Sequence, residues 1–246
     1  MAHSDSPPQR IASRTETNAE SVASRCVAGI IVAAGRGSRF GAAENKVLLN
    51  LAGLPIWIRS LEALQASPWI SRVVVVVRAC DRSEIEPIAN EMGASVVEGG
   101  AERFDSVRCG LDHLRSVGDT SPFVAIHDAA RPLVTSDDID AVVGAAIMSG
   151  AAILATPVRG TIKRLRLGHV STVPRSELWE ALTPQVFAME LIRQAYDRHR
   201  GSPATDDAEL VERCGVEVRL VPGSADNLKI TNAEDLRIAE AMFASR

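Results

Sequence analysis

The sequence predicts an α/β domain with a mostly parallel, twisted sheet flanked by helices. Short runs rich in β-branched residues alternate with stretches of helical periodicity. The runs are almost entirely apolar, as strands covered by helices on both faces must be. The chain has 246 residues and is 46% hydrophobic, and α/β domains of more than about 200 residues often form one unit. We therefore expect a single domain over residues 27–246.

Four runs are expected to form strands of this sheet, over residues 27–32, 73–77, 123–127 and 151–156. Between them, apolar residues at helical spacing predict helices that face the core. These stripes are Trp57, Leu61 and Leu64, then Val107, Leu111 and Leu114, then Ile139, Val142, Val143 and Ala146. Near the C-terminus, Thr231 followed by Glu234 predicts a capping box for a final helix.

Residues 161–173 depart from this pattern. Arg164, Leu165, Arg166 and Leu167 alternate polar and apolar side chains before a turn at Gly168 and the next residue, His169, which predicts a β-hairpin. Because a two-stranded hairpin is marginally stable alone, two placements are open. It protrudes as an arm over about 158–175 and packs on a second copy of the chain, making a homodimer, or it folds back to extend the sheet.

Composition and charge exclude several functions. The 27 Lys and Arg against 31 Asp and Glu give a net charge of −4, which argues against a broadly basic nucleic-acid binder. Aromatic residues make up 4% of the chain, too few for a base-stacking platform. No apolar run approaches the length of about 20 residues that spans a bilayer. We therefore expect no nucleic-acid partner and no membrane partner.

The cysteines and the N-terminal residues bear on location. The four cysteines are widely spaced, which favours neither a zinc site nor a disulfide framework and indicates a reducing cytoplasm. Residues 1–26 are polar and without periodicity, which predicts a disordered tail. An organelle transit peptide is the alternative, but Asp5, Glu16 and Glu20 weigh against it because transit peptides contain few acids. We expect a cytoplasmic protein, and a plastid one only if the tail is a transit peptide.

The loop after the first strand predicts a phosphate cradle. It contains Ala33, Ala34, Gly35, Arg36, Gly37, Ser38, Arg39, Phe40 and Gly41. Small residues let backbone N–H groups approach phosphate, and two arginines followed by Lys46 suit a triphosphate. The loop lacks the dinucleotide fingerprint, since Phe40 stands where a small residue is needed and Arg78 where an acid is needed. A glycine-rich turn with solvated cations is the other interpretation.

Two further groups of residues are candidates for binding. In residues 99–106, Gly100 would let the backbone approach a base and Ser106 would offer a hydroxyl, although Asp105 or Ser106 could simply cap a helix. At the carboxyl end of a predicted strand, where ligands bind in open α/β sheets, Asp128 is the candidate acid. Its alternative is a turn cap, and the neighbouring His127 is expected to be a core residue.

A last group lies late in the chain. It includes Thr183, Thr205 and Lys229, with Arg175 shortly after the hairpin. Taken alone, Lys229 is expected to be an exposed residue within a short apolar strand, and Arg175 carries no signal of its own.

The order of these motifs is more specific than any one of them. In sequence they are Ala33-Ala34-Gly35-x-Gly37-x-Arg39 with Lys46, Gly99-Gly100-x-x-Arg103-x-x-Ser106-Val107, and His127-Asp128-Ala129-Ala130-Arg131-Pro132. Together they resemble the 2-C-methyl-D-erythritol 4-phosphate cytidylyltransferase family. The resemblance continues through Leu182-Thr183-Pro184-Gln185 and Asp226-Asn227-Leu228-Lys229, and so covers residues 27–246.

The resemblance implies a Rossmann-like nucleotidyltransferase fold with a β-hairpin dimerisation arm. It also implies transfer of a cytidylyl group from CTP to 2-C-methyl-D-erythritol 4-phosphate, with release of pyrophosphate, in non-mevalonate isoprenoid synthesis. The attacking phosphate monoester has a second pKa of about 6 and is largely dianionic at neutral pH, so no general base is needed. Cations must instead offset repulsion between the two substrates. Mg²⁺ is the expected ion, held mainly by CTP phosphates, and its protein ligands are left open.

The resemblance also implies roles for individual residues. Arg39 and Lys46 match stabilisers of the transition state, while Arg175 and Lys229 match the pair that positions methylerythritol phosphate, with Arg175 supplied by a partner together with Thr161 and Arg131. The positions that match CTP contacts are Ala33, Ala34, Gly35, Gly37, Gly100, Arg103, Ser106 and Ala129. The positions expected near the second substrate are Asp128, Arg131, Thr161, Thr183 and Thr205.

The sequence also departs from the family pattern. Asn45 and Val47 flank the loop lysine where Pro and Gln are usual, so we expect activity with altered loop closure. An Asn45→Pro variant that binds CTP faster would support this expectation. Gly160 stands where an acid is common and Asp207 where Glu is common.

Other functions remain open. A cytidylyltransferase acting on ribitol 5-phosphate is the nearest alternative, although the residues Ala130-Arg131-Pro132-Leu133 favour methylerythritol phosphate. A sugar-nucleotide pyrophosphorylase using another base is a further alternative, disfavoured by the pyrimidine-type second motif. A non-catalytic nucleotide-binding module is the alternative from another class, but it would not need Arg39, Lys46, Arg175 and Lys229 together.

Overall fold

A seven-stranded sheet forms the centre of the molecule. The computed structural model describes residues 25–35, 45–199 and 204–245, and the strand order is β11-β7-β10-β6-β1-β4-β5. The strands are β1 (Val27–Val32), β4 (Ile70–Val77), β5 (Ser95–Glu98), β6 (Phe123–Asp128), β7 (Ala151–Pro157), β10 (Trp179–Ala188) and β11 (Arg219–Pro222). The four strands predicted from apolar runs are confirmed, whereas β5, β10 and β11 were not predicted.

The sheet is mostly parallel, as expected, with one reversed strand. Strand β1 runs parallel to β4 and β6, β5 parallel to β4, and β11 parallel to β7. Strand β10 is antiparallel to both of its neighbours, β6 and β7. An antiparallel neighbour needs no helical crossover, so the chain leaves β7, forms the hairpin and returns directly as β10.

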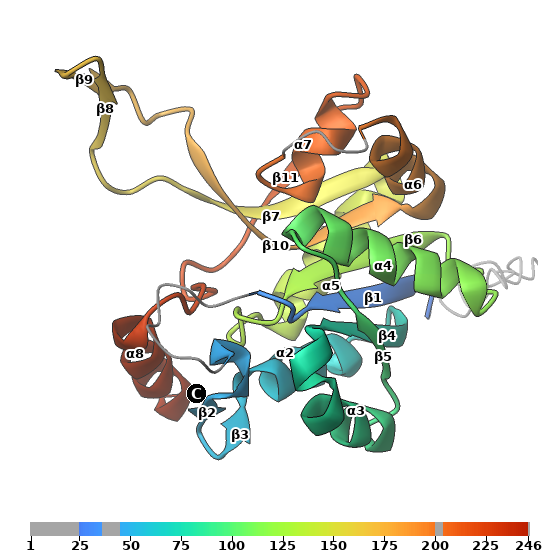
Figure 1. Ribbon diagram of the computed structural model, residues 1–246. Coiled ribbons are helices and arrows are strands. Elements are labelled where there is room, and N and C mark those ends of the chain that lie inside the picture. The colour runs from blue at the N-terminus through green and yellow to red at the C-terminus, as the bar shows by residue number, and fades with distance from the viewer. Residues whose placement is uncertain (1–24, 36–44, 200–203, 246) are drawn as a thin grey trace, which may run out of the picture.

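Helices cover both faces of the sheet (Figure 1). They are α2 (Ile56–Ala66), α3 (Arg82–Glu91), α4 (Arg103–Ser116), α5 (Ser136–Ser149), α6 (Met189–Arg198), α7 (Asp207–Glu212) and α8 (Ala233–Ala244). Ile31 of β1 belongs to one core with α2, α3 and α5, and its neighbour Ile30 belongs to the opposite core with α4 and α6. This alternation follows from the period of two in a strand. The predicted apolar stripes of α2, α4 and α5 all lie in these cores.

Two predicted helix caps were misplaced. Helix α8 begins after Asn232, whose side chain accepts hydrogen bonds from the backbone of Glu234 and Asp235. Thr231 is not the cap, because its backbone and hydroxyl both donate to the Asp235 carboxylate. These two contacts hold Thr231 just outside the helix.

Helix α4 likewise begins one turn earlier than expected. It begins after Glu102, whose backbone N–H donates to Asp105 at 3.4 Å. Ser106 lies inside the first turn, where its hydroxyl donates to the carbonyl of Glu102. Neither Asp105 nor Ser106 is therefore the N-cap residue.

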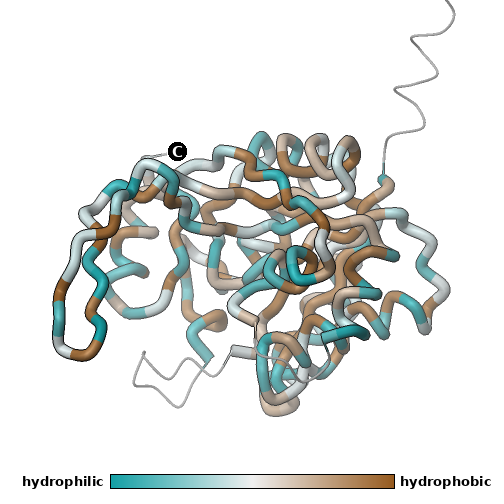
Figure 2. Tube along the Cα trace, turned by 90° about the horizontal axis from the view of Figure 1, so that it is seen from above, coloured by the Kyte–Doolittle hydropathy of each residue, from teal (hydrophilic) through white to brown (hydrophobic). Residues whose placement is uncertain are grey.

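The predicted hairpin forms a separate two-stranded sheet of β8 (Ile162–Arg166) and β9 (His169–Val173). It projects from the domain instead of extending the central sheet (Figure 1). Its turn is at Leu167 and Gly168, which both have positive φ, one residue earlier than predicted, because Arg166 pairs with His169. Figure 2 shows apolar residues among polar ones along this hairpin, and Leu167 is 90% exposed.

The helices of the fold are short. Within the described residues, none is both long and apolar enough to cross a membrane.

Candidate active site

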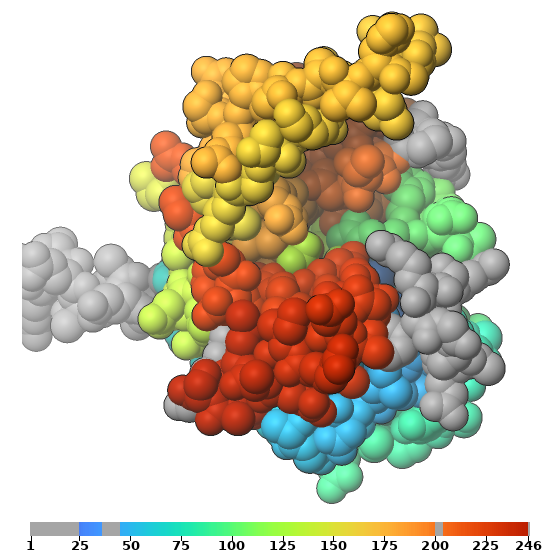
Figure 3. Space-filling view, turned by 90° about the vertical axis from the view of Figure 1, so that its left-hand side faces the viewer, coloured from blue at the N-terminus to red at the C-terminus, as the bar shows by residue number. Residues whose placement is uncertain are grey.

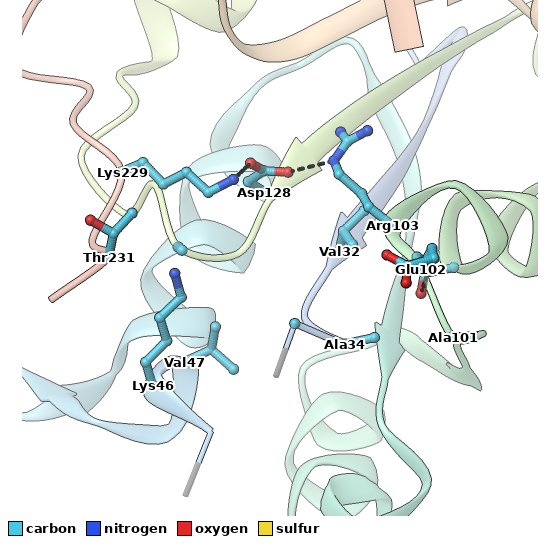
Figure 4. A pocket seen from close by; sticks show the side chains of 13 residues that line it. Val32, Ala34, Lys46, Val47, Ala101, Glu102, Arg103, Asp128, Lys229 and Thr231 are labelled. Carbon is cyan, nitrogen blue, oxygen red and sulfur yellow. Dashed lines mark hydrogen bonds and ion pairs between the residues drawn. The ribbon is translucent and has the colours of Figure 1, made fainter. Parts of the chain in front are cut away.

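A pocket of about 350 Å³ opens at the carboxyl ends of β1 and β6 (Figure 4). The sequence-predicted residues that line it are Ala34, Gly35, Lys46, Arg103, Ser106, Asp128 and Lys229. Val32, Glu102 and Thr231 also line it and were not predicted as site residues. The fold therefore brings together residues from four separate motifs at the edge where open α/β sheets bind ligands.

Asp128 ends β6 and lies between two cations. Its Oδ2 is 2.6 Å from Nζ of Lys229, and its Oδ1 is 3.2 Å from Nε of Arg103. Burial alone would raise the pKa of this carboxyl, but the charges of Arg103 and Lys229 outweigh burial and hold the pKa well below its usual range. Asp128 is therefore an ionised carboxylate that holds two cations in place.

Arg103 is held from two sides. As the first residue of α4, it reaches Asp128 with Nε, while its Nη2 lies 2.8 Å from Oδ2 of Asp207. Burial opposes the charge, yet Asp207 and Asp128 raise the pKa of Arg103 well above its usual value. Asp207 is buried and also accepts a hydrogen bond from Tyr196. The guanidinium orientation is thus fixed before any ligand binds.

Lys46 reaches the same pocket from the other side. It begins a short 3-10 turn, Lys46–Leu48, and its Nζ donates to the carbonyl of Ile230 at 2.6 Å. In Figure 4 the side chains of Lys46 and Lys229 converge on the pocket from this turn and from the C-terminal segment. The contact with Ile230 was not predicted, because every residue has a backbone carbonyl and the sequence does not indicate which one accepts a hydrogen bond.

Lys229 does not lie in a strand, which corrects the prediction. The backbone of the neighbouring Ile230 donates to Ala130, and the Asn227 side chain donates to the carbonyl of Thr183 at 2.9 Å. Ile230 is also buried in a small core with Leu51 and Leu133. No strand forms here: the backbone of Ile230 bonds to the loop after β6, and the Asn227 side chain bonds to β10.

Arg131 belongs to this framework and not to the arm. It is 7% exposed, and its Nη1 donates to the carbonyl of Asn227 at 2.8 Å. Burial lowers the pKa of Arg131, opposed by the nearby charge of Asp128. Arg131 therefore supports the site of its own chain, whereas the resemblance grouped it with the residues supplied by a partner.

His127 is a core residue, as expected. Its Nε2 lies 3.1 Å from the carbonyl of Arg131, and its Nδ1 lies 3.0 Å from the hydroxyl of Thr183. Burial lowers the pKa of His127 to about 4, so the ring is neutral at pH 7. Thr183 also accepts a hydrogen bond from the backbone of Asp128, and this contact fixes the end of β6.

Three small residues predicted at CTP are sequence neighbours of residues that line the pocket but do not line it themselves. A Cβ atom on Gly100 would lie 2.2 Å from the Cβ of Asp105, so only glycine fits there. Ala33 and Ala129 are buried beside the pocket, and the backbone N–H of Ala129 donates to the carbonyl of Val32.

Several predicted residues are not in this pocket. Thr205 bonds with its hydroxyl to Glu209 at the start of α7. Thr161 and Arg175 lie at the base of the hairpin, where Arg175 donates to the carbonyl of Arg159. The predictions for Gly37, Arg39 and most of the N-terminal tail, residues 1–24, fall outside the described residues.

A mostly parallel sheet with an ionised aspartate and three cations at its carboxyl edge suits a nucleotidyltransferase, whose reaction needs positioned cations. The IspD family, described as 2-C-methyl-D-erythritol 4-phosphate cytidylyltransferase, matches residues 27–245. A relative of that name from Rhodopirellula baltica is 46% identical over 88% of this chain and 94% of its own. One from Pelotomaculum thermopropionicum is 44% identical over 89% and 95%. The chain belongs to this cytidylyltransferase family.

Solved structures agree with this assignment. The crystal structure of 2-C-methyl-D-erythritol 4-phosphate cytidylyltransferase from Thermus thermophilus has a TM-score of 0.73 and 32% identity, and it covers 87% of this chain and 98% of that one. The 4-diphosphocytidyl-2C-methyl-D-erythritol synthase from Anaerococcus prevotii has a TM-score of 0.77 and 26% identity, and it covers 90% and 99%.

Proposed function

We propose that this chain transfers the cytidylyl group of CTP to 2-C-methyl-D-erythritol 4-phosphate, giving 4-CDP-2-C-methyl-D-erythritol and pyrophosphate for isoprenoid synthesis. The observation that carries the proposal is the Arg103, Asp128 and Lys229 cluster facing Lys46 across one pocket, in a chain of this family. A phosphate oxygen of methylerythritol phosphate attacks the α-phosphorus of CTP. The bond between that phosphorus and the bridging oxygen breaks, and pyrophosphate leaves with its electron pair.

The chemistry needs cations more than a base. The attacking phosphate is largely dianionic at neutral pH, while Asp128 is ionised within two ion pairs and His127 is buried and neutral. Charge instead builds on the phosphates in the transition state, where prepositioned cations lower the barrier most. Lys46, together with Arg39, is assigned to the phosphates of CTP.

A second hollow suits the other substrate. About 480 Å³ of space lies beside the pocket, lined by Arg131, Glu180, Asn227, Lys229 and Thr231 among others. Figure 3 shows this side of the molecule, where the surface is hollowed between the hairpin and the C-terminal segment. Because Lys229 lines both spaces, we assign it to the attacking phosphate between the two substrates. Polar side chains in the hollow would form hydrogen bonds with the substrate hydroxyls.

CTP is assigned to the first pocket. Ala34 and Ser106 line it with small side chains and Gly35 with none, and the absence of a Cβ at Gly100 lets this turn pack against Asp105. A pyrimidine fits a space walled in this way better than the larger purine. Thr183 and Thr205 act through Asp128 and helix α7, where their hydroxyls are bonded.

Magnesium fits this site as an ion held by the triphosphate. Among the described residues, no group of three or more His, Cys, Asp or Glu side chains could form a protein-only metal centre. A hard cation bound mainly through phosphate oxygens needs few protein ligands, and both oxygens of Asp128 are already paired with Arg103 and Lys229, so the triphosphate would supply most of its shell. When bound, Mg²⁺ would offset negative charge on the triphosphate and the leaving pyrophosphate.

The hairpin is assigned to a homodimer. Leu165 and Val170 on it are 71% and 66% exposed, and apolar side chains at that level favour a partner surface. Thr161 and Arg175 would then reach the second substrate in the partner's site.

The free cysteines of the described chain fit a reducing compartment such as the cytoplasm.

The test is pyrophosphate release with Mg²⁺, offering CTP, UTP, ATP and GTP against methylerythritol phosphate and ribitol 5-phosphate. Release confined to CTP with methylerythritol phosphate is expected. Release with ribitol 5-phosphate alone would change the substrate and keep the mechanism. No release in any combination would favour a non-catalytic nucleotide-binding module.

A further inference from the structure

Asn45, the residue before Lys46, is a polar side chain with no exposed surface. Its Nδ2 donates to the carbonyl of Ala33 at 2.8 Å and to Oδ2 of Asp81 at 2.8 Å. Its Oδ1 accepts a hydrogen bond from the backbone of Val47 at 3.4 Å. One amide thus connects the end of β1, the segment after β4 and the turn that carries Lys46.

Asp81 makes this connection rigid. It is 6% exposed, and Arg78 binds it with two nitrogens, Nε to Oδ2 at 2.6 Å and Nη2 to Oδ1 at 2.7 Å. Burial alone would raise the pKa of Asp81, but the hydrogen bonds from Arg78 and Asn45 outweigh it and the pKa is lowered. Such a two-point ion pair fixes the carboxylate that receives the Asn45 amide.

Both sequence neighbours of Lys46 are buried: Asn45 has no exposed surface, and Val47 is 3% exposed. The backbone of Lys46 is therefore fixed. Only the rotamer of its side chain then decides whether Nζ lies beside the carbonyl of Ile230. A lysine on a loosely held backbone would lose this placement. The loss would slow the reaction, because a displacement of about 1 Å at a reacting site can cost about 100-fold in rate.

We propose that Asn45 is a positioning residue, held by Asp81 and Arg78, that fixes Lys46 against the triphosphate. The proposal rests on the proposed function, which gives Lys46 its role. It replaces the expectation that Asn45 alters the closure of this loop. The φ angle of Asn45 is −73°, within the range that proline imposes, so here side-chain hydrogen bonds supply the restraint that a proline ring would supply.

The first experiment is a double-mutant cycle on pyrophosphate release. Asn45→Ala and Asp81→Ala are expected to lower kcat by about 10- to 100-fold, with little change in KM for methylerythritol phosphate. In a Lys46→Ala background, Asn45→Ala is expected to cost nothing further, because its effect passes through Lys46. A wild-type kcat in Asn45→Ala would overturn the proposal, as would an equal loss in both backgrounds.

Matched variants separate positioning from folding. Arg82→Ala removes a nearby exposed ion pair with Glu86 and should leave kcat and the melting temperature unchanged. Asp81→Asn keeps an acceptor for the Asn45 amide but loses the charge that pairs with Arg78, so it should retain more activity than Asp81→Ala. Equal activity of these two Asp81 variants would contradict the assigned link.

A second measurement does not depend on turnover. Amide hydrogen exchange at Val47 and Leu48 should be faster in Asn45→Ala than in the wild type and unchanged in Arg82→Ala. Unaltered exchange in Asn45→Ala would overturn the positioning role. If the wild type releases no pyrophosphate while exchange responds as expected, the proposed function fails but Asn45 still fixes the turn.

Discussion

Lys229 and Asp128 are 101 residues apart in the sequence, yet Nζ of one lies 2.6 Å from Oδ2 of the other. The pair joins the end of a central strand to a segment that follows the last strand. Because Lys229 lines both the pocket and the neighbouring hollow, the carboxylate holds a cation at the boundary between the two spaces.

Replacement of Lys229 by alanine should therefore affect the reaction more than CTP binding. Loss of one positioned charge in a transition state costs about 100- to 1000-fold in kcat, and we expect kcat/KM for methylerythritol phosphate to fall by that order. Affinity for CTP, measured by calorimetry with Mg²⁺, should change much less. Parallel losses of both would place Lys229 at CTP instead.

Arg175→Ala should weaken the use of methylerythritol phosphate far more than the binding of CTP, because Arg175 lies at the base of the hairpin and not in the pocket that we assign to CTP. Steady-state kinetics with each substrate varied in turn will measure this difference. Arg164→Ala, on the exposed part of the same hairpin, is the control and should retain activity. Equal losses for the two substrates would contradict the role of Arg175.

His127 should make folding stability depend on pH. Its folded pKa is about 4 and its unfolded pKa is about 6.5, so the unfolded chain binds more protons between these values. Stability from this residue is therefore present above about pH 6.5 and is lost as pH falls toward 4. Urea unfolding should show about 2 kcal/mol less stability at pH 5 than at pH 7 from this group. His127→Gln should remove that part of the slope, and an unchanged slope would show that His127 titrates normally.

Gly100→Ala should damage both stability and CTP binding. The added Cβ would meet the Cβ of Asp105 at 2.2 Å, and overpacking of this kind costs about 1 to 3 kcal/mol. Gly144→Ala is the matched control, since nothing lies within 4 Å of its Cβ and alanine favours a helix. Urea unfolding and CTP titration will compare the two variants. A Gly100→Ala protein with wild-type stability would show that the backbone yields there.

The sequence predicted those elements whose signal is local. The runs that became β1, β4, β6 and β7 are apolar because helices cover both faces, and that pattern needs no knowledge of the fold. Strand β10 lacks the pattern, because its first three residues are exposed and Pro184 interrupts it. Its pairing with β6 and β7 depends on the path of the hairpin.

Many of the residues that line the pocket were predicted from the sequence, but the contacts that support them were not. Asp128 and Lys46 occur in recognisable motifs, whereas the bond from Asn45 to Asp81 spans 36 residues and leaves no local pattern. The segment of Lys229 was mistaken for a strand for a similar reason. Its backbone bonds go to Ala130, and a partner in a loop produces no alternation along the chain.

If the projecting hairpin joins two copies of the chain, as proposed, the enzyme is open to subunit complementation. A chain with Lys46→Ala and a chain with Arg175→Ala would each be inactive as homodimers. In a mixed dimer, one site would receive both defects while the other would combine an intact Lys46 with an intact Arg175 from its neighbour. Random mixing of the two inactive proteins would then restore about a quarter of wild-type activity, whereas a hairpin serving its own site would restore none.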